Sequence, residues 1–169
     1  MATRTFAAWV APVAEELRSS RAEIARTARK LLPEHWSMPS PLEGWTYKDL
    51  LAHLASGDWV FQWMLRGALG LEKFDIIERG FEYVNEGNAQ RIAERKGRTA
   101  EELIAEVESE GEATQELLAR LPEDLDRGQV VGRMRDGTPV TVERWMQGFP
   151  RHDVGHGAQL RTVLDQVML

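Results

Sequence analysis

Apolar residues recur three or four positions apart along most of the chain, which is the spacing of a helix that buries one face. Four segments show this pattern, over about residues 6–33, 47–65, 82–121 and 142–167. Amphipathic segments of this length and number predict an all-α protein in which the helices form a four-helix bundle. The chain has 169 residues, so we expect residues 1–169 to form one domain.

Two of these segments carry signals for the start of a helix. Thr46 precedes the second segment and Asp49 follows three positions later, where a carboxylate interacts favourably with the exposed amides of the first turn. Thr99 and Glu102 have the spacing of a capping box. Residues 96–98, just before this capping box, contain a glycine that can break or bend a helix. The third segment is therefore either one bent helix or two helices.

The connections between the segments differ in length and character. Residues 67–81 contain three glycines and predict a connection with at most a short helical turn. Asp136 and Gly137 form a turn signal between short β-branched runs, which predicts a small hairpin before the last helix. Pro150 is expected to kink that helix.

The last helix carries two histidines on its apolar face. Positions 145, 149, 152, 156, 160, 163 and 167 share this face and read Trp, Phe, His, His, Leu, Val, Val. The neighbouring stripe, with Asp153, Arg161 and Asp165, carries charges and is expected to face solvent. His152 and His156 are therefore expected to point into the bundle.

His53 interrupts an apolar face of the second helix in the same way, beside Leu50 and Met64. Two imidazoles one turn apart and a third from a facing helix can bind one divalent ion and leave coordination positions open. Gly57, one turn after His53, has no side chain to fill the adjacent space. His53, His152 and His156 are thus candidate metal ligands.

A structural role for these histidines is the alternative, because a lone histidine on an apolar face is often a hydrogen-bonded core residue. The pair on the last helix also lacks the glutamate of the H-E-x-x-H metal motif. His35 follows the first helix in a polar loop, where a surface or helix-end role is expected rather than ligation.

Other conspicuous side chains are interpreted as structural. Trp45, Trp59, Trp63 and Trp145 fall where helix packing would use them. Asn85 and Asn88 open the third segment and either cap it or reach a binding pocket, with the cap favoured.

Composition excludes several kinds of function. The net charge is −6, without a run of basic residues that could neutralise phosphates, so no nucleic-acid partner is expected. The chain has no cysteine, so any thiol chemistry needs a thiol from outside. The apolar runs FAAWVAPVA and WVFQWML are much shorter than the roughly 20 residues of a membrane span. The first run continues into an amphipathic helix pattern rather than a cleavage site, so we expect a soluble cytoplasmic protein.

Three segments carry a resemblance that covers most of the chain: WSMPSPLEGWTYKDLLAHLASGD, YVNEGNAQRIAERKGRTAEELIAEVESEGEATQELLARLPED and VERWMQGFPRHDVGHGAQL. They resemble the DinB-like superfamily, in particular its mycothiol-dependent maleylpyruvate isomerase-type branch. The resemblance implies a four-helix bundle with a divalent metal, commonly zinc or nickel, held by His53, His152 and His156. The isomerases of this branch have a glutamate at the place of His152, so this chain is closer to the three-histidine form found in thiol transferases of the superfamily.

The resemblance implies a metal-dependent S-transferase or isomerase that uses mycothiol, bacillithiol or glutathione as a low-molecular-weight thiol cosubstrate. A hydrolase with a metal-bound water and a non-catalytic small-molecule-binding dimer are the alternatives. Asp49 and Asp153 are candidate acceptors for hydrogen bonds from the ligand imidazoles. Apolar surface around Trp9 and residues 74–81 favours a homodimer.

Overall fold

The computed structural model describes residues 4–133 and 136–167, without the side chains of residues 77, 81, 166 and 167. The elements are helix α1 (Ala11–Ala28), the short 3₁₀ helix η1 (Pro33–Ser37), helices α2 (Tyr47–Ser56), α3 (Asp58–Ala68), α4 (Ile76–Glu94) and α5 (Ala100–Leu118), strands β1 (Val130–Arg133) and β2 (Pro139–Thr141), and helix α6 (Val142–Val167).

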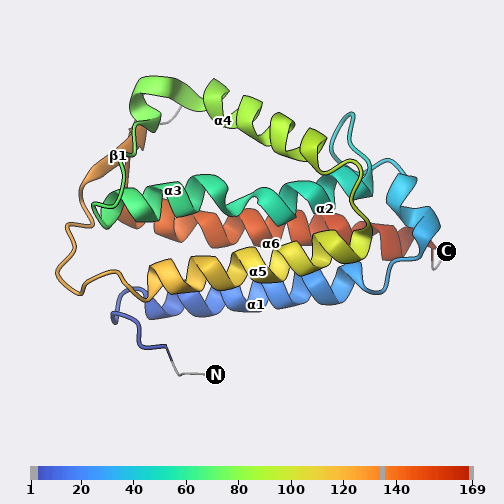
Figure 1. Cartoon of the computed structure of the whole chain (residues 1–169), viewed down its shortest axis with the longest axis horizontal. Coiled ribbons are helices and arrows are strands. Elements are labelled where there is room, and N and C mark those ends of the chain that lie inside the picture. The colour runs from blue at the N-terminus through green and yellow to red at the C-terminus, as the bar shows by residue number, and fades with distance from the viewer. Residues whose placement is uncertain (1–3, 134–135, 168–169) are drawn as a thin grey trace.

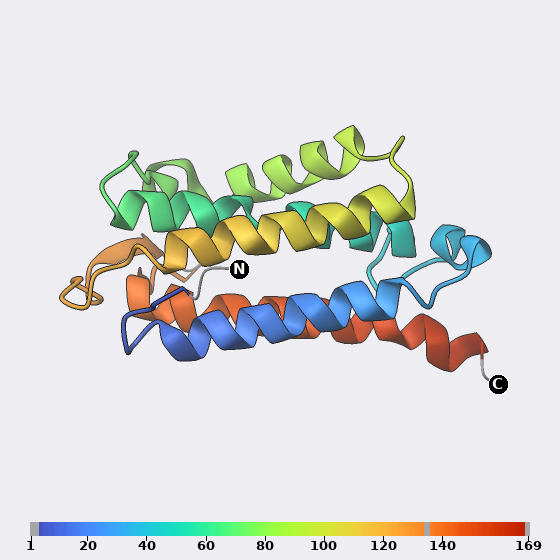
Figure 2. The same cartoon turned by 60° about the horizontal axis from the view of Figure 1, so that its bottom comes forward.

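The long helices form the predicted four-helix bundle (Figure 1). Helix α1 packs against α5 and α6, while α2 and α3 follow each other along one edge and pack against α5 and α6 from the other side. The colour gradient shows that α1 and α6 run in one direction and that the α2–α3 pair and α5 run in the other. Helix α4 lies outside this bundle and contacts α2 (Figure 2).

Both predicted helix starts are confirmed. The Thr46 hydroxyl accepts a hydrogen bond from the Asp49 amide at 3.2 Å, and an Asp49 carboxylate oxygen accepts one from the Thr46 amide at 2.9 Å. Thr99 and Glu102 make the equivalent pair of bonds at the start of α5. The third predicted segment consists of two helices, α4 and α5.

The second predicted helix is divided at Gly57, which separates α2 from α3. The prediction of one helix over residues 47–65 was therefore wrong. The Leu54 carbonyl would bond the amide of residue 58 in a regular helix. In the structure the buried Arg21 donates its Nη1 to that carbonyl at 2.8 Å, from a helix far away in the sequence.

The predicted hairpin is present, and its strands pair in antiparallel fashion with Val130 opposite Thr141. Gly137 has a φ of 84°, which the turn requires and glycine adopts without strain. Residues 134 and 135 of the turn lie outside the described residues. Helix α6 continues through Pro150 as one helix.

The core consists of two apolar clusters with a polar layer between them. One cluster joins the second half of α1 to α2, the start of α5 and the end of α6. The other joins the first half of α1 to α3, the end of α5 and the start of α6. On each side of the bundle a buried polar residue stands between the residues of the two clusters. These residues are Arg21 on α1, Asp58 on α3, Thr114 on α5 and Asp153 on α6.

Two of the side chains expected to expose apolar surface are half-buried. Trp9 packs against the second cluster and donates its indole Nε1 to the Pro122 carbonyl at 3.2 Å. Phe74 packs edge-on against Trp63 and Trp145. The side chain of Phe81 lies outside the described residues. Across the described part of the chain, the helices are too short or too polar to cross a membrane.

Candidate metal centre

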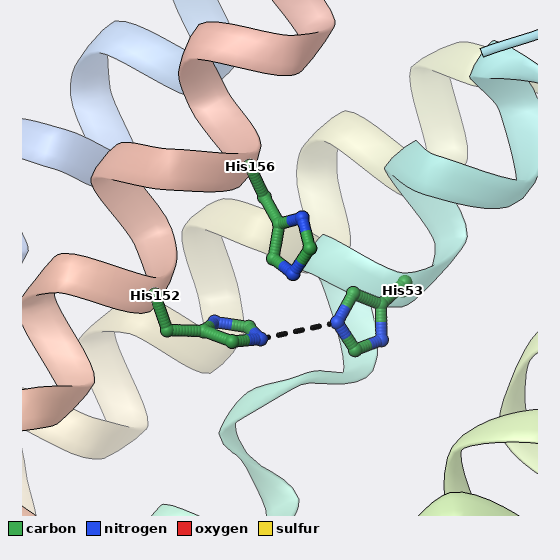
Figure 3. Close-up of side chains that lie close together, drawn as sticks. All are labelled: His53, His152 and His156. Atoms are coloured by element: carbon green, nitrogen blue, oxygen red, sulfur yellow. Dashed lines mark hydrogen bonds between the residues drawn. The ribbon is translucent and has the colours of Figure 1, made fainter. Parts of the chain in front are cut away.

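The structure brings the side chains of His53, His152 and His156 together between α2 and α6 (Figure 3). One potential ligand nitrogen from each lies within 4.8 Å of the other two. The Nε2 atoms of His53 and His152 are 3.1 Å apart. Tetrahedral ligand nitrogens about 2.0–2.1 Å from one ion would be separated by about 3.4 Å, so small movements suffice for coordination.

Local structure explains why the three imidazoles meet. His152 and His156 are one turn apart on α6, and their ring centroids are 4.4 Å apart. His53 occupies the last turn of α2, just before the break at Gly57. A Cβ at Gly57 would lie 3.0 Å from the His53 carbonyl oxygen, which is a tight contact, and 3.6 Å from Cε1 of His152, which is an ordinary one.

Burial keeps the imidazoles of His53 and His156 neutral. Desolvation, reinforced by the neighbouring His152 and His156, lowers the pKa of His53 to about 3. Desolvation together with His152 also lowers the pKa of His156. Both rings therefore hold a free lone pair at neutral pH, which is the form of histidine that binds metals.

The Nδ1 atoms of the two α6 histidines face acceptors, which leaves their Nε2 atoms to face the centre (Figure 3). The side-chain oxygen of Gln159 lies 2.6 Å from Nδ1 of His156. A carboxylate oxygen of Asp153 lies 3.4 Å from Nδ1 of His152. Nδ1 of His53 is buried and finds no hydrogen-bond partner among the described residues. Gln159 was not among the site residues predicted from the sequence, although its position three residues after His156 places it on the next turn.

The predicted position of Asp153 on a solvent-facing stripe is wrong. Its side chain is fully buried and accepts a hydrogen bond from Arg21 Nε at 2.6 Å. Burial alone would raise the pKa of Asp153, but the Arg21 guanidinium and His152 outweigh it and lower that pKa. The periodic pattern missed this because the compensating charge comes from α1. Asp49, the other candidate acceptor, lies in the cap with Thr46.

His35 lies away from this cluster, in η1. It is buried, and its Nδ1 accepts a hydrogen bond from the Leu32 amide at 3.0 Å, at the start of η1. The helix-end role expected for His35 is confirmed, whereas a surface position is not.

A cleft with two lobes opens onto the three histidines. The larger lobe has a volume of about 1090 Å³ and reaches past Trp145, Phe149, Arg144 and Arg151. The smaller lobe, of about 690 Å³, is lined by Trp45, Glu43, Asp49 and Lys96, among others. His53 and His152 line both lobes.

Helix α4 forms one wall of both lobes through Asn85 and Asn88. Because α4 begins at Ile76, these residues lie within the helix, and the favoured interpretation of them as caps was wrong. The side-chain oxygen of Asn88 accepts a hydrogen bond from Trp59 Nε1 at 2.8 Å, which orients its amide. Trp59 and Trp63 pack between α3 and α4, outside the two apolar clusters, while Trp45 and Trp145 pack against the clusters as expected.

A helical bundle with three histidines in an open cleft places the protein among the DinB-like bundles. The chain belongs to the family of the mycothiol maleylpyruvate isomerase N-terminal domain, which matches residues 17–158. No curated protein matches the chain in sequence.

Two solved structures share the fold. One is the mycothiol-dependent maleylpyruvate isomerase, with 16% identity and a TM-score of 0.68, and the other is a mutant of that enzyme, with 17% identity and a TM-score of 0.70. Each match covers 89% of this chain and 60% of the solved chain. The chain therefore spans less than two thirds of the length of these relatives.

Proposed function

We propose that this protein is a divalent-metal-dependent enzyme in which His53, His152 and His156 hold the ion and a low-molecular-weight thiol is a cosubstrate. The observation that carries the proposal is the convergence of three imidazoles at the junction of two cleft lobes. Its reaction is a thiol-dependent isomerisation, as in the name of the mycothiol-dependent isomerase that shares its fold, or an S-transfer.

The residues fit a metal ion in their chemistry. Two of the three imidazoles have lowered pKa values, so little proton competition opposes coordination at neutral pH. Three nitrogen donors of intermediate softness suit zinc or nickel. An ion bound at this centre would favour the deprotonated form of the cosubstrate's thiol, which is the nucleophile that the cysteine-free chain lacks.

The chain's own residues supply binding and orientation. Gln159 and Asp153 hold the α6 imidazoles with Nε2 toward the centre. The two lobes give a thiol and an electrophile separate approaches to that centre, and each is large enough for a small organic molecule. Asn88, held by Trp59, lies at the border of the lobes and presents its amide to bound molecules.

Two further features belong to this proposal. A thiol cosubstrate favours a cytoplasmic location, where low-molecular-weight thiols are kept reduced.

We also propose that the protein is a homodimer. The support for this is no longer Trp9 and Phe74, which are half-buried, but exposed apolar side chains on or near α4, which are those of Leu71, Tyr83 and Val130. Light scattering at micromolar concentration would measure its mass.

The test of the proposed function is thiol consumption by the untagged protein loaded with zinc or nickel. Mycothiol, bacillithiol and glutathione would each be offered with 1-chloro-2,4-dinitrobenzene. In this transfer a C–S bond forms, the C–Cl bond breaks, chloride leaves and the thiol proton passes to solvent. We expect one thiol to react faster than in the uncatalysed mixture, and His156→Ala to abolish the difference.

The same assay distinguishes the rival functions. Hydrolysis of an activated ester without any thiol would replace the proposal with a metal-dependent hydrolase. Metal-loaded protein that accelerates neither reaction and no thiol-dependent isomerisation, yet binds small apolar molecules, would favour a non-catalytic binding dimer.

A further inference from the structure

Arg21 is a buried arginine that contacts the helices carrying the three histidines. It lies on α1, which has no histidine, and its side chain is 6% exposed. Its Nε donates to Asp153 at 2.6 Å, its Nη1 donates to the Leu54 carbonyl at 2.8 Å, and its Nη2 pairs with Asp58.

Two of these acceptors directly follow candidate ligands. Leu54 is the residue after His53, and Asp153 is the residue after His152. The guanidinium is planar, and its donors have a fixed geometry. Bonding to both acceptors therefore fixes the separation of α2 and α6 at the positions from which the imidazoles project.

The third partner ties the same group to the remaining helix of the bundle. Asp58 accepts a hydrogen bond from the Thr114 hydroxyl at 2.7 Å, and that hydroxyl also accepts one from Gln62 Nε2 at 3.1 Å. Arg21, Asp58 and Asp153 thus form one satisfied network that reaches all parts of the bundle. We call these three residues the Arg21 network.

Stability alone does not account for charges at this position. Apolar clusters lie on both sides of the layer, so apolar residues there would join them into one core. Replacing a buried ion network by packed apolar residues is often neutral or stabilising, because the charges lose their desolvation cost. The network therefore needs another reason, and its bonds beside His53 and His152 provide one.

We propose that Arg21 is a positioning residue for the metal centre and that the Arg21 network holds α2 and α6 at the spacing that coordination requires. This inference rests on the proposed function, because it presumes that the histidines bind an ion. It assigns to α1, which carries no ligand, a direct part in the affinity for metal.

Two variants remove the network without leaving an unpaired buried charge. The first is Arg21→Met/Asp58→Leu/Asp153→Leu. The second is Arg21→Met/Asp58→Leu/Asp153→Asn, which keeps an acceptor beside Nδ1 of His152 and isolates the effect of the arginine. Arg29→Met is the matched control, because Arg29 directly follows the same helix and pairs with Glu108 at 2.8 Å on the surface.

The readouts are zinc affinity, by competition with a chromophoric chelator, and the visible absorption spectrum of bound cobalt. We expect both triple variants to unfold cooperatively in urea, to bind zinc about 10–100-fold more weakly, and to give an altered cobalt spectrum. The control is expected to match the wild-type protein in both readouts. Folded triple variants with wild-type affinity and spectrum would overturn the proposal.

Arg21→Lys provides a second test if the triple variants do not fold. Lysine keeps the charge but lacks the planar fork, so we expect weaker zinc binding and a shifted cobalt spectrum in a folded protein. Wild-type values for this variant would also overturn the positioning role. A wild-type protein that binds no zinc, nickel or cobalt would instead refute the proposed function itself.

Discussion

The outward nitrogen of each imidazole decides where its inward nitrogen points. A ring whose Nδ1–H is bonded to an acceptor is held in the tautomer that leaves a lone pair on Nε2. Gln159 does this for His156 at 2.6 Å, and Asp153 approaches His152 at the longer distance of 3.4 Å. Gln159 is therefore the stronger of the two orienting contacts.

Replacing Gln159 tests this role. Gln159→Leu removes the acceptor while keeping a similar volume, so we expect zinc affinity to fall about 10-fold or more, as measured by chelator competition. Gln159→Glu keeps an acceptor and adds a charge that strengthens the imidazole as a ligand, so its affinity should equal or exceed the wild-type value. Equal affinities in all three proteins would show that His156 needs no orienting partner.

The lowered pKa of His53 predicts how the stability of the metal-free protein depends on pH. A histidine buried in its neutral form binds its proton more readily when unfolded, where its pKa is near 6.5, than when folded, where it is about 3. Its contribution to stability is therefore complete above about pH 6.5 and is lost as the pH falls toward 3. His156 shifts in the same direction.

Urea unfolding of the metal-free protein between about pH 7.5 and 5 measures this effect. We expect the free energy of unfolding to decrease with falling pH, by at most about 1.4 kcal/mol per pH unit for His53. The dependence should be shallower in His53→Gln, which cannot take up the proton. An unchanged slope in that variant would assign the pH dependence to other groups.

For single residues, the sequence predicts which side chains converge but not every group that forms a hydrogen bond or ion pair with them. The three histidines stand out because each interrupts an apolar stripe on its own helix. Asp153 was placed in solvent because the arginine that compensates its charge lies 132 positions away. Asn88 was interpreted as a cap because a helix start was expected close to it, but the helical turns that carry Asn88 begin just after the break at Gly80.

Among the elements, α4 is distinctive because it forms a wall of the cleft but lies outside the bundle. Its contact with α3 depends on Trp59, which is hydrogen-bonded to Asn88 and stacked under the Arg91 guanidinium at 4.0 Å. Gly87 allows this close approach, since a Cβ there would lie 2.8 Å from the Trp59 ring. Gly80, with a φ of 75°, turns the chain before this part of the helix.

Two glycine-to-alanine substitutions test how closely α4 is packed. In an open helix interior alanine is favoured over glycine by about 0.5–1 kcal/mol, and a Cβ at Gly155 of α6 meets nothing within 4 Å. We expect Gly155→Ala to stabilise the protein by this amount. Gly87→Ala should destabilise it and change the tryptophan fluorescence, because Trp59 must move. Equal stabilisation by both would mean that α4 is not held against Trp59.

The elements were predicted wherever their cause is local in the sequence. Capping boxes, the Asp136–Gly137 turn and amphipathic periodicity identified the bundle helices and the hairpin. The break between α2 and α3 was not predicted, because an arginine on α1 bonds the carbonyl at that point. The placement of α4 outside the bundle depends on side-chain contacts that periodicity does not encode.

In the whole molecule, a layer of buried polar residues separates two apolar clusters of the bundle, and the cleft opens beside this layer. The polar layer and the histidine cluster are adjacent, because Asp153 bonds to Arg21 and also contacts His152. The chain spans 60% of the length of the two solved relatives that share its fold.

The proposed function depends above all on the binding of one divalent ion by His53, His152 and His156. The most direct test is a calorimetric titration of zinc into the untagged, metal-free protein and into His156→Ala, with His35→Gln as a control outside the cluster. We predict one ion per wild-type chain and per His35→Gln chain, and binding in His156→Ala that is too weak to reach this stoichiometry. A wild-type chain that binds no zinc, or a His156→Ala chain that binds it with wild-type affinity and stoichiometry, would contradict the account.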